Sequence, residues 1–172
     1  MKPRALAITA IALAVASGSV AGQGPSQSVR PHDLIPRLAG TWSFEMFVRG
    51  RDYPFGKGQR EMKLLADSTK LLWTDKYDGS PLTGAGLLGY DERFTAFYLM
   101  SVQTNQSTPA FILGYSKDST IVWNPARTAE IWDDQGLGTY IVSELRLIDA
   151  DHFEWVAVNG AWRVEYARVR GT

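Results

Sequence analysis

The feature that most constrains the fold of this chain is an alternation of apolar and polar side chains with a period of two residues. It first appears in residues 40–50, where Trp42, Phe44, Met46 and Val48 alternate with polar neighbours. Such alternation is typical of a half-buried β-strand, because successive side chains point to opposite faces of a sheet. The pattern recurs in nine further stretches: residues 59–67, 69–78, 86–91, 93–102, 110–118, 119–126, 138–149, 152–159 and 161–170.

Turn-forming segments separate these stretches, among them DGSPLTG, TNQSTP, SKDS, DDQGLG and DADH. About ten short strands, spaced by roughly ten residues, predict an all-β domain whose antiparallel sheet closes into a sandwich or barrel. Asn159-Gly160 predicts a two-residue hairpin turn of type I′, with positive φ at both residues, between the last two strands. One segment departs from the pattern: PHDLIPRLAG, residues 31–40, predicts a short helical turn before the first strand.

The beginning of the chain has the layout of a secretory signal peptide. Lys2 and Arg4 precede an apolar run that ends near Ala16, and small residues follow. We expect a signal peptide over residues 1–21, a flexible leader over 22–33 and one barrel domain over 34–170, in a periplasmic or secreted protein. The chain contains no cysteine, so the domain must be stabilised by its core without disulfides.

Charge argues against a nucleic-acid partner. Acidic and basic residues number 18 each, and the most basic segment, RVEYARVR, alternates its charges with apolar residues as the wet face of a strand does. Nucleic-acid binding requires a net basic domain or a basic stripe.

The segment GAGLLGYD contains Gly84, Gly86 and Gly89 in the spacing of a dinucleotide-binding turn. That function also needs a preceding parallel strand, a helix that starts in the turn and an acidic residue about 20 positions later. Here an alternating strand follows instead, and no Asp or Glu occurs between Glu92 and Asp118. We therefore interpret the glycines, Gly89 among them, as structural residues that relieve crowding in a coiled strand.

Six Trp, seven Tyr and seven Phe make the chain rich in aromatic residues. If Trp42 points inward, the strand phases place an aromatic and apolar set in the barrel interior, and this set is the candidate ligand-binding site: Trp42, Phe44, Met46, Trp73, Tyr98, Met100, Trp155 and Tyr166. Such an interior is either a filled core or an apolar pocket for a small hydrophobic molecule.

The segments LAGTWSFE, GAGLLGYD and SELRLIDADHFEWVAV with a final VEYARVR resemble a bacterial family of calycin-like barrels known as a domain of unknown function. The resemblance covers residues 34 to 170. The calycin group also includes lipocalins and nitrobindin-like haem proteins. It implies a single antiparallel calycin-like barrel of about ten strands with a short N-terminal helix and an interior cavity. It also implies structural roles for Gly40, in the Gly-x-Trp opening, and for Arg168, stacked on Trp42.

His32 and His152 are the only histidines, so zinc sites built on cysteine or several imidazoles are excluded. We expect no metal and no cofactor. The exception is an axial haem ligand at His152, a residue otherwise expected at the barrel rim.

Our leading hypothesis is a non-enzymatic exported barrel, monomeric or dimeric, that binds or carries a small hydrophobic ligand. The alternatives are a haem-binding or enzymatic barrel that uses the same cavity, and a filled barrel that binds partners through rim loops such as TNQSTP and DDQGLG. An outer-membrane barrel is disfavoured, because the charged residues lie opposite the Trp42 face.

Overall fold

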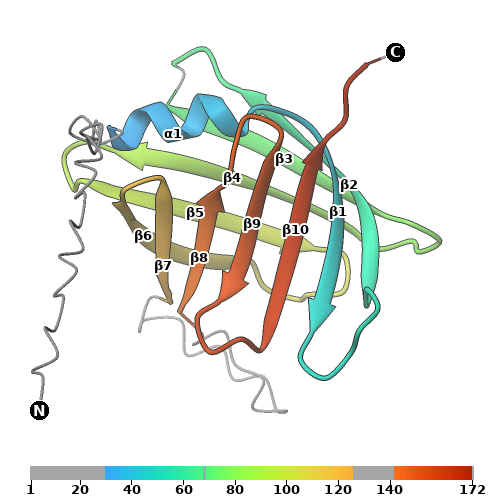
Figure 1. Ribbon diagram of the computed structural model, residues 1–172. Helices are drawn as coiled ribbons and strands as arrows, with labels where there is room; N and C mark the ends of the chain where they lie inside the picture. Colours follow the sequence, from blue (N-terminus) through green and yellow to red (C-terminus); the bar gives the residue numbers. More distant parts are fainter. Residues whose placement is uncertain (1–29, 68, 126–141, 172) are drawn as a thin grey trace, which may run out of the picture.

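The computed structural model describes residues 30–67, 69–125 and 142–171. This part of the chain forms one helix and ten strands (Figure 1). The elements are α1 (Pro31–Leu38), β1 (Gly40–Val48), β2 (Gly56–Leu64), β3 (Lys70–Tyr77), β4 (Thr83–Asp91), β5 (Ala96–Gln103), β6 (Ala110–Lys117), β7 (Thr120–Pro125), β8 (Ser143–Leu147), β9 (His152–Ala157) and β10 (Trp162–Arg168). No helix among these residues is long and apolar enough to cross a membrane.

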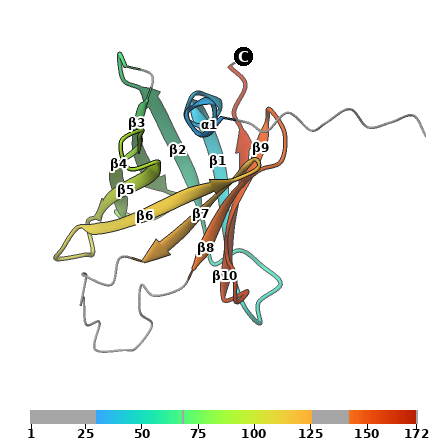
Figure 2. The same cartoon turned by 90° about the vertical axis from the view of Figure 1, so that its left-hand side faces the viewer.

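The strands form one closed antiparallel barrel in which each strand pairs with its neighbours in sequence. Closure comes from β1 and β10, whose register sets Trp42 opposite Arg168 and Val48 opposite Trp162. Strands β4–β6 behind cross β8–β10 in front at a steep angle (Figures 1 and 2). The predicted all-β barrel of about ten strands with a short N-terminal helix is confirmed.

Helix α1 covers one end of the barrel, which we call the closed end (Figure 1). Leu34, Ile35 and Leu38 lie on one face of the helix and are fully buried in the core, as their spacing on a helix predicts. The indole nitrogen of Trp42 donates a hydrogen bond to the carbonyl of Leu38 (2.8 Å), which ties the first strand to the helix. The opposite end, which we call the open end, carries the β1–β2, β3–β4, β5–β6 and β9–β10 turns.

The boundaries of the N-terminal region differ in part from those expected. Helix α1 starts at Pro31, so residues 31–33 belong to the helix and not to the leader. The expected signal peptide, residues 1–21, lies outside the described residues, as do the DDQGLG loop and residues 126 and 138–141 of the expected strands.

The glycines of GAGLLGYD lie in β4, which pairs antiparallel with both β3 and β5. A Cβ at Gly86 would collide with the carbonyl of Met100 and the ring of Trp73, and one at Gly89 would collide with the ring of Tyr98. The glycines therefore allow close side-chain packing on both faces of this strand, and no helix follows them to bind a dinucleotide.

The expected inward orientation of Tyr98 and Met100 is wrong. Pairing with β4 sets Phe97 opposite Tyr90 and Leu99 opposite Leu88, and it is Phe97 and Leu99 that are buried. Met100 is 45% exposed on the outer face. Strand β5 is apolar in both phases, so alternation alone does not distinguish its two faces.

The hairpin between β9 and β10 is present, but its turn is not of type I′. Gly160 has a positive φ of 70°, whereas Asn159 does not. Gly160 donates its N–H to the carbonyl of Ala157 (2.8 Å), and the Asn159 side chain accepts the N–H of Ala161 (3.0 Å). This side-chain contact stabilises a longer turn in which glycine alone takes the left-handed conformation.

Candidate ligand-binding site

A cavity of about 300 Å³ lies at the open end of the barrel. Its walls come from β1, β2, β3, β5, β9 and β10 and from the β1–β2 loop, and most of its lining is apolar: Phe44, Met46, Val48, Phe55, Trp155, Trp162 and Val164. The polar lining consists of Arg60, Asp75, Tyr77, Gln103 and Tyr166. Apolar walls with a few convergent polar groups are typical of a small-molecule pocket.

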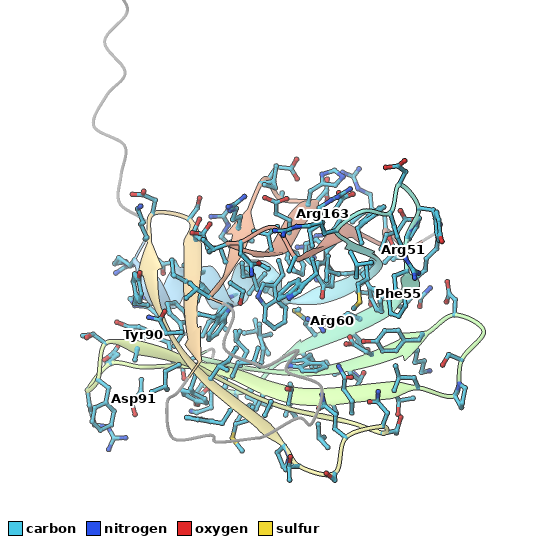
Figure 3. The ribbon with its side chains drawn as sticks, turned by 90° about the horizontal axis from the view of Figure 1, so that it is seen from below. Arg51, Phe55, Arg60, Tyr90, Asp91 and Arg163 are labelled. Carbon is cyan, nitrogen blue, oxygen red and sulfur yellow. The ribbon has the colours of Figure 1, made fainter. Side chains whose placement is uncertain are left out.

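An ion pair between Arg60 and Asp75 lies within the lining. The two residues are direct neighbours on β2 and β3. Nε and Nη2 of Arg60 donate to the two carboxylate oxygens of Asp75 at 2.7 Å each. Their side chains are 8% and 1% exposed, and Figure 3 shows Arg60 inside the ring of strands. A bidentate pair of this kind holds both groups in one orientation.

Aromatic rings enclose the guanidinium group of Arg60. Its Cζ atom lies 4.3 Å from the ring centroid of Trp73 and 5.1 Å from that of Tyr166. Burial by itself lowers the pKa of Arg60, but its interactions with Tyr166 and Asp75 outweigh burial, so the pKa is raised and the group keeps its charge. A cation between two ring faces is stabilised by their quadrupoles.

Tyr166 and Tyr77 are uncharged groups of the cavity lining. Burial raises the pKa of Tyr166 well above its ordinary value, against the opposing effect of the Arg60 charge. Burial and the charge of Asp75 also raise the pKa of Tyr77. Both phenols therefore remain protonated at neutral pH and can donate or accept hydrogen bonds.

The mouth of the cavity includes Phe55 from the β1–β2 loop. The N–H of Phe55 donates to the carbonyl of Met46 (2.6 Å), and Arg51 lies 5.6 Å from the centroid of the Phe55 ring. Phe55 is 61% exposed. An apolar ring is thus held at the entrance, where a ligand would cover it.

The structure brings together half of the expected ligand-binding residues: Phe44, Met46, Trp155 and Tyr166 line the cavity. Trp73 contacts the cavity indirectly, through Arg60. Trp42 lies at the closed end, and Tyr98 and Met100 lie on the outer face. The sequence reasoning did not select Arg60 and Asp75, although alternation with Met62 on β2 and with Trp73 on β3 could have indicated that both point inward.

Arg168, Gly40 and Trp42 form a structural cluster at the closed end. The guanidinium of Arg168 lies 4.1 Å from the Trp42 ring centroid, as its strand phase indicates. It also donates to the carbonyls of Ala39 (2.7 Å) and Ala150 (2.9 Å). Gly40 has a φ of 133°, and a Cβ there would collide with the Arg168 guanidinium. The cluster joins α1, β1 and β10, and none of its three residues lines the cavity.

The two histidines lie outside the cavity lining. His152 is exposed at the start of β9, and its Nδ1 lies 3.0 Å from the carboxylate of Asp149. His32 lies beside Asp33 in α1. Within the described ranges, no three His, Asp or Glu side chains gather in a way that could hold a metal ion.

Two buried donors in the interior have no acceptor within reach among residues 30–67, 69–125 and 142–171. They are the indole N–H groups of Trp73 and Trp123. By contrast, the indole N–H of Trp155 donates to the hydroxyl of Ser143 (2.9 Å). An unpaired buried donor costs about 1–3 kcal/mol.

In comparisons with known proteins, neither a protein-family model nor a curated protein sequence matches this chain. The class of protein to which the chain belongs is therefore defined by its fold and its cavity. The chain is a closed ten-stranded antiparallel barrel, consistent with the calycin-like architecture, with a helix over one end and an apolar cavity at the other.

Proposed function

We propose that this protein is an exported, non-enzymatic barrel that binds or carries a small hydrophobic molecule in the cavity at its open end. The observation that carries the proposal is an apolar cavity of about 300 Å³ with a few inward polar groups. A cavity of this size is at the lower limit for small-molecule sites, which span about 300–1,000 Å³.

Export and family membership are part of the same proposal. The signal-peptide pattern of residues 1–21 supports a periplasmic or secreted location. The sequence motifs and the barrel support membership of the bacterial calycin-like family of unknown function. Haem binding through His152 is not part of the proposal, because that imidazole is exposed beside Asp149 at the start of β9.

Binding can be tested with the neutral fluorescent probe N-phenyl-1-naphthylamine and a pair of valine variants. Val48 lines the cavity, so Val48→Trp should fill the pocket and weaken probe binding at least tenfold. Val169 is 42% exposed just after β10, at the closed end, so Val169→Trp should leave binding unchanged. Fluorescence titration measures both affinities, and native mass spectrometry of the protein from its own compartment identifies a resident ligand by mass.

The result that would contradict the proposal is a wild-type protein that neither takes up the probe nor carries a bound small molecule. Equal binding by the wild type and Val48→Trp would also contradict it, because the probe would then occupy another surface.

A second candidate function follows from the outer surface of β3–β6, which we call the outer apolar face. Leu72 pairs with Leu87, Leu87 with Met100, and Met100 with Phe111, so one apolar row crosses four strands. Six large side chains of this face are 42–48% exposed: Leu72, Met100, Val102, Phe111, Leu113 and Tyr115. Residues 83–90, 96–103 and 110–116 contain no charged side chain.

The area of this face favours a second copy of the chain as its occupant. With 150–250 Å² for each large side chain, the six exposed fractions sum to on the order of 500 Å². That is near the largest patches on monomers, about 300–600 Å², and it is more than half of the roughly 800 Å² per partner in a stable interface. The part of the face on β4–β6 carries no charge, so it can meet its own copy across a twofold axis without repulsion.

We infer that the protein forms a dimer through the outer apolar face. In sedimentation velocity at micromolar concentration, the wild type should be dimeric and Phe111→Glu monomeric. Gln59→Glu, which adds the same charge at an exposed position of β2, should remain dimeric. A wild type that is monomeric at every concentration, or a dimeric Phe111→Glu variant, would contradict this assignment.

A further inference from the structure

The charges that line the cavity compensate each other. Of the lining residues in the described part of the chain, Arg60 and Asp75 alone are charged, and they bind each other through two hydrogen bonds. The lining therefore has no net charge, although it contains a guanidinium group.

The guanidinium group of Arg60 is in contact with Asp75 along one edge and with aromatic rings over its plane. Its Nε and Nη2 donors are directed to Asp75, and the rings of Trp73 and Tyr166 lie within 4.3 and 5.1 Å of its Cζ. Nε and one N–H of Nη2 form the side-on fork of the guanidinium, and both are bound to Asp75, so the charge of Arg60 is neutralised there. An anionic ligand would have to compete with a buried carboxylate that is 1% exposed.

A charged ligand group would thus enter an apolar cavity without a free counterion. Transfer of an unpaired charge out of water is far more costly than transfer of a neutral polar group that finds a hydrogen bond. Neutral partners are available in Tyr77, Gln103 and Tyr166, whose hydroxyl and amide groups both donate and accept.

We propose that the cavity selects uncharged ligands: an apolar body with one neutral hydrogen-bonding group, such as an amide or an alcohol. The inference rests on the proposed function, since it specifies the ligand class of the same cavity. The cavity volume of about 300 Å³ is at the lower limit of small-molecule sites, so the ligand is small. The corresponding carboxylates and amines are rejected because the charges of Arg60 and Asp75 neutralise each other, which leaves no counterion for the ligand.

The test compares three linear probes with eight carbon atoms each: octanamide, octanoate and octylammonium. At pH 7.5 the acid and the amine are both ionised, so the three differ in charge but little in size. Each is titrated against N-phenyl-1-naphthylamine bound to the wild-type protein. We expect octanamide to displace this probe with an affinity at least tenfold higher than either ion.

Each outcome has one meaning. Octanoate or octylammonium binding as tightly as octanamide would overturn the selection of neutral ligands while the proposed function stands. If N-phenyl-1-naphthylamine itself fails to bind, the proposed function falls, and this inference falls with it. Preference for octanamide supports both.

Asp75→Asn provides a second, independent measurement. The substitution leaves the guanidinium of Arg60 without its counterion, so the preference should reverse and octanoate should bind at least tenfold more tightly than octanamide. Asp78→Asn, which removes an exposed carboxylate from the β3–β4 turn, should keep the wild-type preference. An Asp75→Asn protein that folds and still prefers octanamide would contradict the role of the ion pair. If the variant does not fold, the wild-type comparison still decides.

Discussion

At the scale of single residues, the buried Arg60–Asp75 pair is the unusual feature of this barrel. Desolvation of two charges offsets most of their mutual attraction, so a buried ion pair adds little stability compared with apolar residues of the same size. Both residues lie in the cavity lining, where the pair provides a surface that is polar but carries no net charge among apolar walls. The pair is therefore better explained by what the cavity accepts than by stability.

Tyr166 should make the protein less stable at alkaline pH. The pKa of Tyr166 is raised in the folded protein, mainly by burial, whereas in the unfolded chain the tyrosine has a pKa of about 10. Below that pH both states are protonated and this group adds no pH dependence. Above it, the unfolded state releases the proton and the folded state retains it, so the free energy of unfolding falls as pH rises, by up to about 1.4 kcal/mol per pH unit.

Urea unfolding of wild type and Tyr166→Phe at about pH 9 and pH 11 measures this effect. The loss of stability between the two values should be smaller in Tyr166→Phe than in the wild type. Tyr115→Phe, which changes an exposed tyrosine on the outer face, should behave as the wild type does. Identical slopes in Tyr166→Phe and wild type would show that Tyr166 does not contribute.

At the scale of elements, the closed end depends on contacts that join a helix to strands distant in sequence. Arg168 at the end of β10 reaches the carbonyls of Arg37 and Ala39, at the C-terminal end of α1, while it covers the ring of Trp42 on β1. These contacts connect the first and last elements of the described chain, where the barrel closes.

Arg168→Ala should destabilise the barrel by roughly 2 kcal/mol, from the lost cation–π contact and the unpaired carbonyls at the helix end. Arg163→Ala is the matched control, because Arg163 also lies on β10 and over a ring, that of Phe47 at 4.1 Å, but on the exposed face. We expect a change of less than about 1 kcal/mol there. Thermal and urea unfolding report both, and unchanged melting of Arg168→Ala would contradict the pairing with Trp42.

At the scale of the whole molecule, the barrel is asymmetric in two ways. One end is covered by α1 and the other holds the cavity (Figure 1). One side of the outer wall is uncharged over residues 83–90, 96–103 and 110–116 of β4–β6, whereas the other side carries ion pairs such as Lys57–Glu45 on β2 and β1 and Arg146–Glu154 on β8 and β9. The first asymmetry supports ligand binding through one opening, and the second supports association through one face.

The sequence by itself determined the number and order of the strands, the short helix and the inward face of β1 and β10. In these elements apolar and polar residues alternate clearly, and burial of the apolar face leaves a single phase. It also excluded a dinucleotide site. The residues that follow the three glycines alternate as a strand does and contain no acidic residue between Glu92 and Asp118, so the helix and the carboxylate that such a site needs are missing. The stacking of Arg168 on Trp42 followed from strand phase together with the family resemblance.

Only the tertiary structure decided which face of β5 is buried, where the cavity lies and that Arg60 and Asp75 meet inside it. The strand β5 is apolar on both faces, so its phase depends on its register with β4, which is a contact between strands and not a property of either one. Likewise, Arg60 and Asp75 are fifteen residues apart. The residues next to a charged side chain in an alternating strand do not indicate which residue of another strand pairs with it. Interior charge is tolerated only as a pair, and this pair depends on the register between β2 and β3.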